Sequence, residues 1–177
     1  GSRYGDTLAD KVASHVLSFR HPDFVKYSFL ERGSDDRQYC SPGVDLPLVT
    51  LCRSKFGKYP EYHTSLDNLD VVTPKGLQGG YELVLDCLSV LEESKVYRIA
   101  CRGEPQLGKR GLYPNLSIKG AATSTQSMMD LIAYADGTND LLDIANLIRV
   151  PIWELLPLAE KLCRAGLLLE ERGGKSR

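Results

Sequence analysis

A stretch between Gly103 and Thr125, rich in Gly, Pro, Ser and Lys, constrains the fold of this chain more than any other feature. Such a composition is typical of a linker, because it lacks the apolar periodicity with which a helix or strand buries one face. The chain has 177 residues, a length that allows one ordinary domain or two small ones. We therefore predict a first domain over residues 1–102, a linker over 103–124 and a second domain over 125–177.

The first part follows the order helix, strand, loop, strand, loop, helix, which fits the closing half of an α/β sandwich. An apolar stripe from Leu8 to Phe19 predicts a helix that His21-Pro22 ends. Short apolar runs predict strands, and the middle one is of the fully buried type. These runs are Lys26–Leu30, Leu48–Cys52 and Val96–Cys101.

A second, longer helix is predicted to begin at Thr73-Pro74, because Thr is a favoured N-cap and Pro a favoured first helical residue. One face of this helix is apolar at helical spacing, so we expect that face to pack in the core. Its residues are Leu77, Tyr81, Val84, Leu88 and Leu91.

The second part contains three helical patterns followed by a short apolar strand. The first pattern covers about 127–135 and ends at Gly137, and the second is capped by Asp140. The third begins at Pro151 and ends at Gly166, and Leu167–Leu169 follows as the strand. Three helices and a strand in this order predict a winged-helix-like domain.

Charge argues against nucleic acid as the partner of this second domain. The whole chain carries 22 basic and 23 acidic side chains, which gives no general attraction to nucleic acid, anionic membrane or polyanionic substrate. The third helix carries Glu154 and Glu160 against Lys161 and Arg164. Phosphate contacts dominate affinity for DNA, so we expect this helix to serve domain packing or protein contact.

The five cysteines are widely spaced and form no C-x-x-C pair, as is common for free thiols in a reducing compartment. No run of about 18 apolar residues is present, so no membrane span is predicted. We expect a cytoplasmic protein.

The segment Tyr62–Asn68 carries an isolated His63 among small polar residues, with Asp67 four positions on. A histidine in this setting has the chemistry of a metal ligand with a hydrogen-bond partner. Zinc needs three or four protein ligands, and this chain has three histidines in all. From the residues alone, His63 is either a ligand or a hydrogen-bonded loop histidine, and Asp67 either orients its ring or caps the turn.

A second polar loop, Gly33–Tyr39, precedes the Leu48–Cys52 strand, and the His63 segment follows it. Sites in α/β domains lie at the carboxyl ends of strands, so we expect Asp35 and His63 at the same rim. Arg37 either neutralises the neighbouring carboxylates, meets a substrate carboxyl group or forms a surface ion pair.

Together, Gly33–Tyr39, Pro42–Pro47 and Tyr62–Asn68 resemble the last third of zinc aminopeptidases of the M28 type. More narrowly, they resemble bacterial aminopeptidase-like proteins associated with polysaccharide biosynthesis, in which a winged helix follows the peptidase domain. This narrower resemblance covers nearly the whole chain, including Gln106–Pro114. The M28 pattern has Ser-Asp-His where this chain has Ser34, Asp35 and Asp36, a departure that matches the narrower group.

The resemblance implies a pair of zinc ions for which His63 supplies the last ligand, while the other ligands and a general-base Glu come from an upstream part that is not in this chain. It further implies a peptide substrate and a pocket lined by seven residues. They are Asp35, Asp36, Arg37, Gln38, Tyr39, Tyr62 and Asp67. His15 is expected to be a helix-edge or core histidine, and His21 is expected to cap the helix end or to lie in solvent. The chain alone is then expected to be inactive and to bind zinc weakly. The alternatives are a non-catalytic scaffold that uses its winged helix for protein contact, and a DNA-binding regulator.

Overall fold

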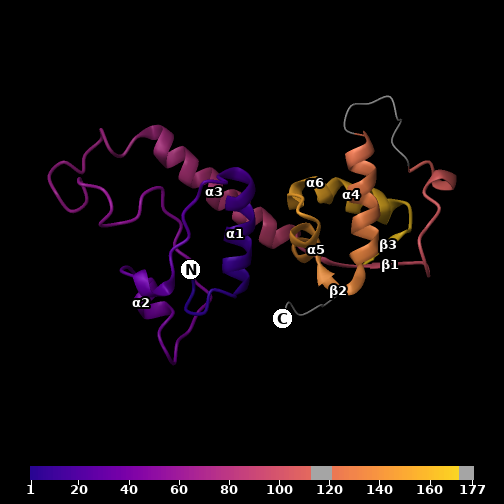
Figure 1. Cartoon of the computed structure of the whole chain (residues 1–177), viewed down its shortest axis with the longest axis horizontal. Coiled ribbons are helices and arrows are strands. Elements are labelled where there is room, and N and C mark those ends of the chain that lie inside the picture. The colour runs from indigo at the N-terminus through magenta and orange to yellow at the C-terminus, as the bar shows by residue number, and fades with distance from the viewer. Residues whose placement is uncertain (113–120, 172–177) are drawn as a thin grey trace. The chain divides into compact units, whose positions relative to one another are not determined.

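The computed structural model describes residues 1–112 and 121–171 (Figure 1). The chain divides into two compact units, Gly1–Ser89 and Val90–Arg177. The predicted linker therefore does not mark the division. Residues 113–120, which contain the end of the Gln106–Pro114 segment, lie outside the described part.

The first unit begins with helix α1, Leu8–Arg20, as the apolar stripe predicts. Thr7 caps it: the Thr7 hydroxyl accepts from the Asp10 N–H, and the Asp10 carboxylate accepts from the Thr7 N–H. This reciprocal capping satisfies two amides that a helix start leaves without partners. Val12, Val16 and His15 are buried on its inner face.

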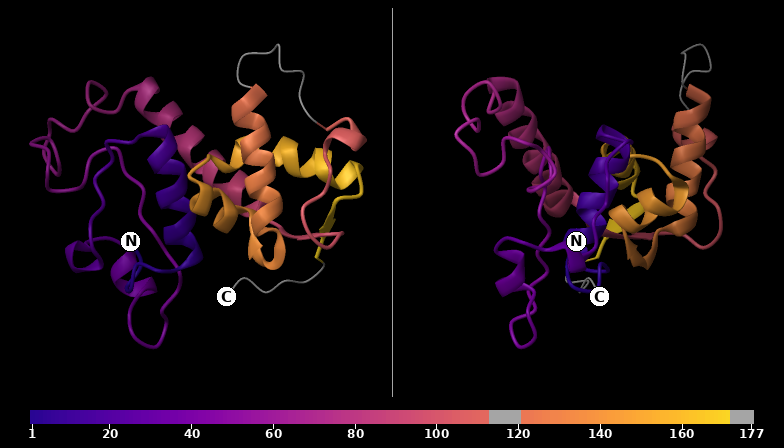
Figure 2. Two further views of the ribbon diagram at one scale, coloured as in Figure 1. Left: turned by 45° about the vertical axis from the view of Figure 1, so that its right-hand side comes forward. Right: turned by 60° about the vertical axis from the view of Figure 1, so that its left-hand side comes forward.

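Between α1 and the next long helix, the chain is mostly irregular (Figure 2). It contains a 3-10 turn, η1 (Phe29–Glu31), and a single helical turn, α2 (Asp36–Tyr39). The strands predicted at Lys26–Leu30 and Leu48–Cys52 are not formed, and the second of these runs is not fully buried. A strand exists by pairing with another backbone, and no segment of the described first unit pairs with either run.

Helix α3, Pro74–Glu93, starts where the sequence predicts. The Thr73 hydroxyl accepts from the Gly76 N–H at 3.1 Å, which caps the first turn. The prediction for its apolar face is wrong for this chain. Leu77, Tyr81, Leu88 and their apolar neighbours are exposed, and Val90 is the buried residue among the described side chains of α3.

The second unit is built on a three-stranded antiparallel sheet of order β2-β1-β3. Strand β1 (Val96–Ile99) pairs with β2 (Asp136–Asp140) on one side and with β3 (Leu168–Glu170) on the other. The strand predicted at Val96–Cys101 thus forms, but as the centre of this sheet. Its backbone bonds place it in the second unit, although the sequence assigns it to the first.

Three helices pack beside this sheet: α4 (Ala121–Tyr134), α5 (Leu141–Ile148) and α6 (Ile152–Arg164) (Figure 1). Asp140 caps α5 with a capping box, as predicted, and Gly166 follows α6 with φ 67°. The residues that fill the core between these elements are almost fully buried. They are Met128, Leu131, Leu141, Leu142, Ile144, Ile152, Leu155, Leu162, Leu167 and Leu168. The unit is a winged-helix domain with a complete apolar core.

Part of the predicted linker is packed against this core. Leu107 and Leu112 flank a 3-10 turn, η2 (Gly108–Arg110), and both side chains are buried. The Lys161 ammonium of α6 donates to the Leu112 carbonyl at 3.1 Å. None of the helices in the described ranges is both long and apolar enough to cross a membrane.

Candidate functional site

The loop that carries His63 is a series of turns held by its own polar groups. The Thr64 hydroxyl donates to the Glu61 carbonyl at 2.8 Å and accepts from the Leu66 N–H at 3.2 Å. The Asp67 N–H donates to the Thr64 carbonyl at 3.2 Å. His63 itself adopts a left-handed backbone with φ 59°, a conformation that costs free energy for a residue with a Cβ. Such conformations concentrate at functional sites, so His63 is a candidate.

An aromatic cluster holds the His63 ring. The imidazole stacks on Tyr62, with ring centroids 4.0 Å apart and planes 16° from parallel. Tyr62 meets Tyr59 edge to face at 5.7 Å and lies 6.3 Å from the Phe56 ring. Aromatic contacts of this kind add to the apolar area that they bury, so the cluster fixes one face of the His63 ring while His63 remains exposed.

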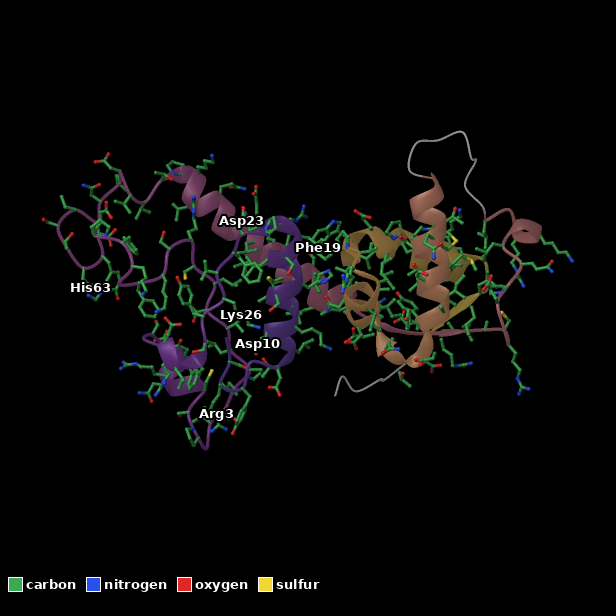
Figure 3. The ribbon with its side chains drawn as sticks, viewed as in Figure 1. Arg3, Asp10, Phe19, Asp23, Lys26 and His63 are labelled. Atoms are coloured by element: carbon green, nitrogen blue, oxygen red, sulfur yellow. The ribbon has the colours of Figure 1, made fainter. Side chains whose placement is uncertain are left out.

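The same cluster joins the two polar loops. The Phe56 ring lies against Gly33, where a Cβ would come within 2.4 Å of a ring carbon. Gly33 opens the loop of Asp35 and Asp36, so Phe56 and Tyr62 connect that loop to His63 through ring contacts. The predicted strand-end rim does not form, because the strands that would define it are absent. Figure 3 shows His63 in its loop, away from helix α1 with Asp10 and Phe19.

The carboxylates of the Gly33–Tyr39 loop differ in their surroundings. Asp36 is buried and accepts from the Ser34 N–H at 3.0 Å, so it stabilises the loop. Asp35, Arg37, Gln38 and Tyr39 are exposed on or beside the α2 turn. Of the carboxylate pair, Asp35 therefore remains accessible to a ligand.

Asp67 acts electrostatically on Tyr59. Partial burial raises the pKa of the Tyr59 phenol, and the nearby Asp67 carboxylate raises it further. The two roles proposed for Asp67 from the sequence, orienting His63 or capping the turn, remain hypotheses.

The cluster residues Phe56 and Tyr59 are not among the sites predicted from the sequence. Their signal is the spacing of aromatic residues at every third position, Phe56, Tyr59 and Tyr62, directly before His63. That spacing in a loop gives no helical or strand period, so a search for regular elements passes over it.

The metal-binding capacity of the described residues is small. Among residues 1–112 and 121–171, no three His, Cys, Asp or Glu side chains are grouped so that they could hold a metal ion. His15 is buried in α1, where its ring lies 5.0 Å from Phe19, and His21 is the exposed C-cap of the same helix. The described residues therefore offer a zinc ion one candidate imidazole ligand, His63. A zinc site would need further ligands from outside these residues.

The outer face of α6 is the surface that would meet DNA in a winged helix. Its exposed residues are Glu154, Pro157, Glu160 and Arg164. The Arg164 guanidinium pairs with the Glu160 carboxylate at 2.9 Å, and the Lys161 ammonium is bound to a carbonyl. This face is mixed in charge, with acidic side chains beside each basic one.

Comparison with known proteins shows the family. A family described as a domain of unknown function, DUF4910, matches residues 1–94, which is more than half of the chain. The chain belongs to the DUF4910 family. A winged helix-turn-helix family matches residues 95–170, in agreement with the fold of the second unit.

One relative is a Clostridium acetobutylicum protein named for a proposed role in polysaccharide biosynthesis and for an aminopeptidase-like domain. It is 34% identical over 169 residues, which cover 94% of this chain and 39% of the relative. A crystal structure of a proposed peptidase from the same organism matches with a TM-score of 0.82 and 33% identity, over 96% of this chain and 37% of that one. The chain thus spans about two fifths of the length of these two relatives, one named for an aminopeptidase-like domain and the other for a proposed peptidase. These comparisons confirm that the chain resembles aminopeptidase-like proteins and that it carries a winged helix.

Proposed function

We propose that this DUF4910 chain forms part of a zinc-dependent aminopeptidase-like hydrolase, in which His63 is one metal ligand. The observation that carries the proposal is the placement of His63. Its imidazole is exposed, stacked on Tyr62 and set in a left-handed turn beside a second polar loop. The aminopeptidase-like relative supports the reaction class.

The residues of this chain would share three tasks. His63 would donate one ring nitrogen to the metal, with Tyr62 holding the plane of the ring. The exposed Asp35 carboxylate and Arg37 guanidinium offer charges that match the ammonium and carboxyl groups of a peptide substrate. Bound zinc in such enzymes polarises a carbonyl and lowers the pKa of a water molecule. The remaining ligands and the general base would come from residues outside those described.

We further propose that the winged-helix unit serves packing or protein contact and does not read DNA. The support is the outer face of α6, where Glu154 and Glu160 weaken any attraction to phosphate and Arg164 is paired. Affinity for DNA depends on basic side chains that are available to neutralise phosphates. A cytoplasmic location also remains a proposal from the sequence.

A chimaera tests the hydrolase proposal. Residues 1–177 would replace the matched segment of the Clostridium relative, and hydrolysis of aminoacyl p-nitroanilides would be measured with zinc present. The His63→Ala chimaera should lose activity by at least about 100-fold, since even a residue that supports a metal ligand contributes 10 to 100-fold. A His21→Ala chimaera, which changes another exposed histidine, is the matched control and should stay active.

Two results would contradict the proposal. One is a His63→Ala chimaera as active as its parent. The other is a folded chimaera without hydrolysis beside an active relative, which would favour the non-catalytic scaffold.

A further inference from the structure

Lys55, in the irregular segment before the His63 loop, holds its charge among aromatic rings. The Lys55 ammonium nitrogen lies 4.9 Å from the centroid of the Tyr27 ring and 5.1 Å from that of the Phe56 ring. It also meets the Glu31 carboxylate at 3.5 Å, and the Lys55 side chain is only 12% exposed. A lysine usually extends its ammonium into water, so Lys55 differs from an ordinary surface lysine.

On one side, Lys55 contacts the chain that leads into the first polar loop, Gly33–Tyr39. Glu31 ends η1, two residues before this loop, and Tyr27 lies just before η1. A cation is attracted both by a carboxylate and by the face of an aromatic ring. The Lys55 charge therefore links the start of the first loop to the Phe56 ring, which is attracted to the same charge.

On the other side, Phe56 continues these contacts to His63. The Phe56 ring lies against Gly33 and 6.3 Å from the Tyr62 ring, on which the His63 imidazole stacks. The φ angle of Gly33 is outside the left-handed region, so the backbone here does not require glycine. The missing side chain at Gly33 instead leaves room for the Phe56 ring.

Side-chain contacts are what join the two loops. In residues 1–112 and 121–171, no backbone hydrogen bond runs between Gly33–Tyr39 and Phe56–Asp67, and no strands pair there. A ligand that touches both loops needs them at a fixed spacing, because a small displacement of a positioned group weakens its action. The contacts that start from Lys55 meet this need.

We propose that Lys55 is a positioning residue, whose charge holds the Gly33–Tyr39 loop and His63 in one arrangement. The role of His63 as a metal ligand rests on the proposed function, whereas the ring contacts of Lys55 do not depend on it. Packing of the lysine stem alone would give the same burial. The charge is therefore what the experiment has to isolate.

The test compares two variants of Lys55 in the full chain by NMR of the histidine rings. The stacked Tyr62 ring shields the ring protons of His63. Lys55→Met keeps an unbranched stem and removes the charge, so this shielding should be lost. Lys55→Arg keeps a cation that binds rings and carboxylates, so the shielding should remain. If stem packing were the role of Lys55, the methionine variant would keep the His63 signal.

Lys58→Met is the matched control, because Lys58 is an exposed lysine three residues further along the same segment. It should leave the His63 signal unchanged. The ring signals of His15 and His21, in α1 and at its end, should stay in place in every variant and show that α1 is folded. A wild-type His63 signal in Lys55→Met, or an equal loss of shielding in Lys58→Met, would overturn the proposal.

Gly33→Ala tests the same link without changing the charge. The added Cβ would come within 2.4 Å of a Phe56 ring carbon, so the ring must move and the His63 signal should shift. Gly79→Ala is its control, because nothing lies within 4 Å of a Cβ at that position. A Gly33→Ala chain with the wild-type His63 signal would overturn the link through Phe56.

Zinc binding by the chimaera with the Clostridium relative separates this proposal from the hydrolase proposal. Lys55→Met should weaken zinc binding by about 10-fold, the lower end of the effect of groups that orient a metal ligand. Ring signals that respond as expected, beside zinc binding that does not depend on His63, would reject the hydrolase proposal and support the positioning role. An unchanged His63 signal in Lys55→Met, beside zinc binding that depends on His63, would overturn the role of Lys55 alone.

Discussion

The completeness of the winged-helix core can be tested by truncating Leu155, which is fully buried in α6. Replacing a buried leucine with alanine removes its transfer free energy and leaves a cavity, and together these cost about 2 to 5 kcal/mol. For a unit of this size, a loss of about 3 kcal/mol lowers the melting temperature by roughly 12 to 24 °C. Leu155→Ala should therefore unfold the second unit at a much lower urea concentration than the wild-type chain.

The assay is urea denaturation followed by Trp153 fluorescence, because Trp153 is the one tryptophan of the chain and lies in α6. Leu147→Ala is the matched control: the same chemical change at an exposed position in α5 of the same unit should alter the free energy of unfolding by no more than about 0.5 kcal/mol. If Leu147→Ala shifts the Trp153 transition as far as Leu155→Ala does, the described difference between buried and exposed positions in the second unit is wrong. An unshifted Leu155→Ala transition would refute the described packing of α6.

Three further results are expected. Burial alone would raise the pKa of Asp10, but hydrogen bonds from Ser2 and Thr7 outweigh burial and lower that pKa. The ionised Asp10 therefore stabilises the folded chain above the ordinary carboxyl pKa of 3.8, and this stabilisation is lost as the pH falls through the lower pKa of the folded state. Asp10→Asn should reduce thermal stability at pH 7 and flatten the acid side of its pH profile; a profile as steep as that of the wild type would count against this role. Burial raises the pKa of the Cys87 and Cys163 thiols, so Cys52, which is exposed, should be alkylated first at pH 8, as mass spectrometry of digests would reveal. The full chain should not bind duplex DNA at physiological salt. Salt-sensitive micromolar binding that is lost in the double variant Lys161→Ala, Arg164→Ala would overturn the assignment of α6 to packing or protein contact.

Local signals in the sequence predicted the helices well. Thr73-Pro74 and Asp140 mark helix starts because capping depends on neighbouring residues alone, and both are confirmed. The winged-helix order also followed from such local signals. The place of β1 did not follow from local signals. Its two partner strands, β2 and β3, lie about 40 and about 70 residues further along the chain.

Burial in the first unit was the main failure of prediction from sequence. The periodicity of Leu77 to Leu88 shows that this face of α3 suits a core, but it does not say which polypeptide supplies the other side. Leu48–Cys52 is a similar case, since β-propensity describes fit to a sheet that must already exist. For the site, His63 was evident from residue type, whereas its support by Phe56 and Tyr59 depends on a loop conformation that no period encodes.

The central claim, that His63 is one ligand of a zinc site completed by residues outside this chain, is tested most directly by metal content after dialysis. Zinc would be measured in the isolated chain, in the chimaera with the Clostridium relative and in its His63→Ala variant. The account predicts far less than one zinc per isolated chain, retained zinc in the chimaera and a loss of zinc on His63→Ala, because one imidazole leaves the metal mostly hydrated. Stoichiometric zinc in the isolated chain, or a chimaera whose zinc content does not depend on His63, would contradict it.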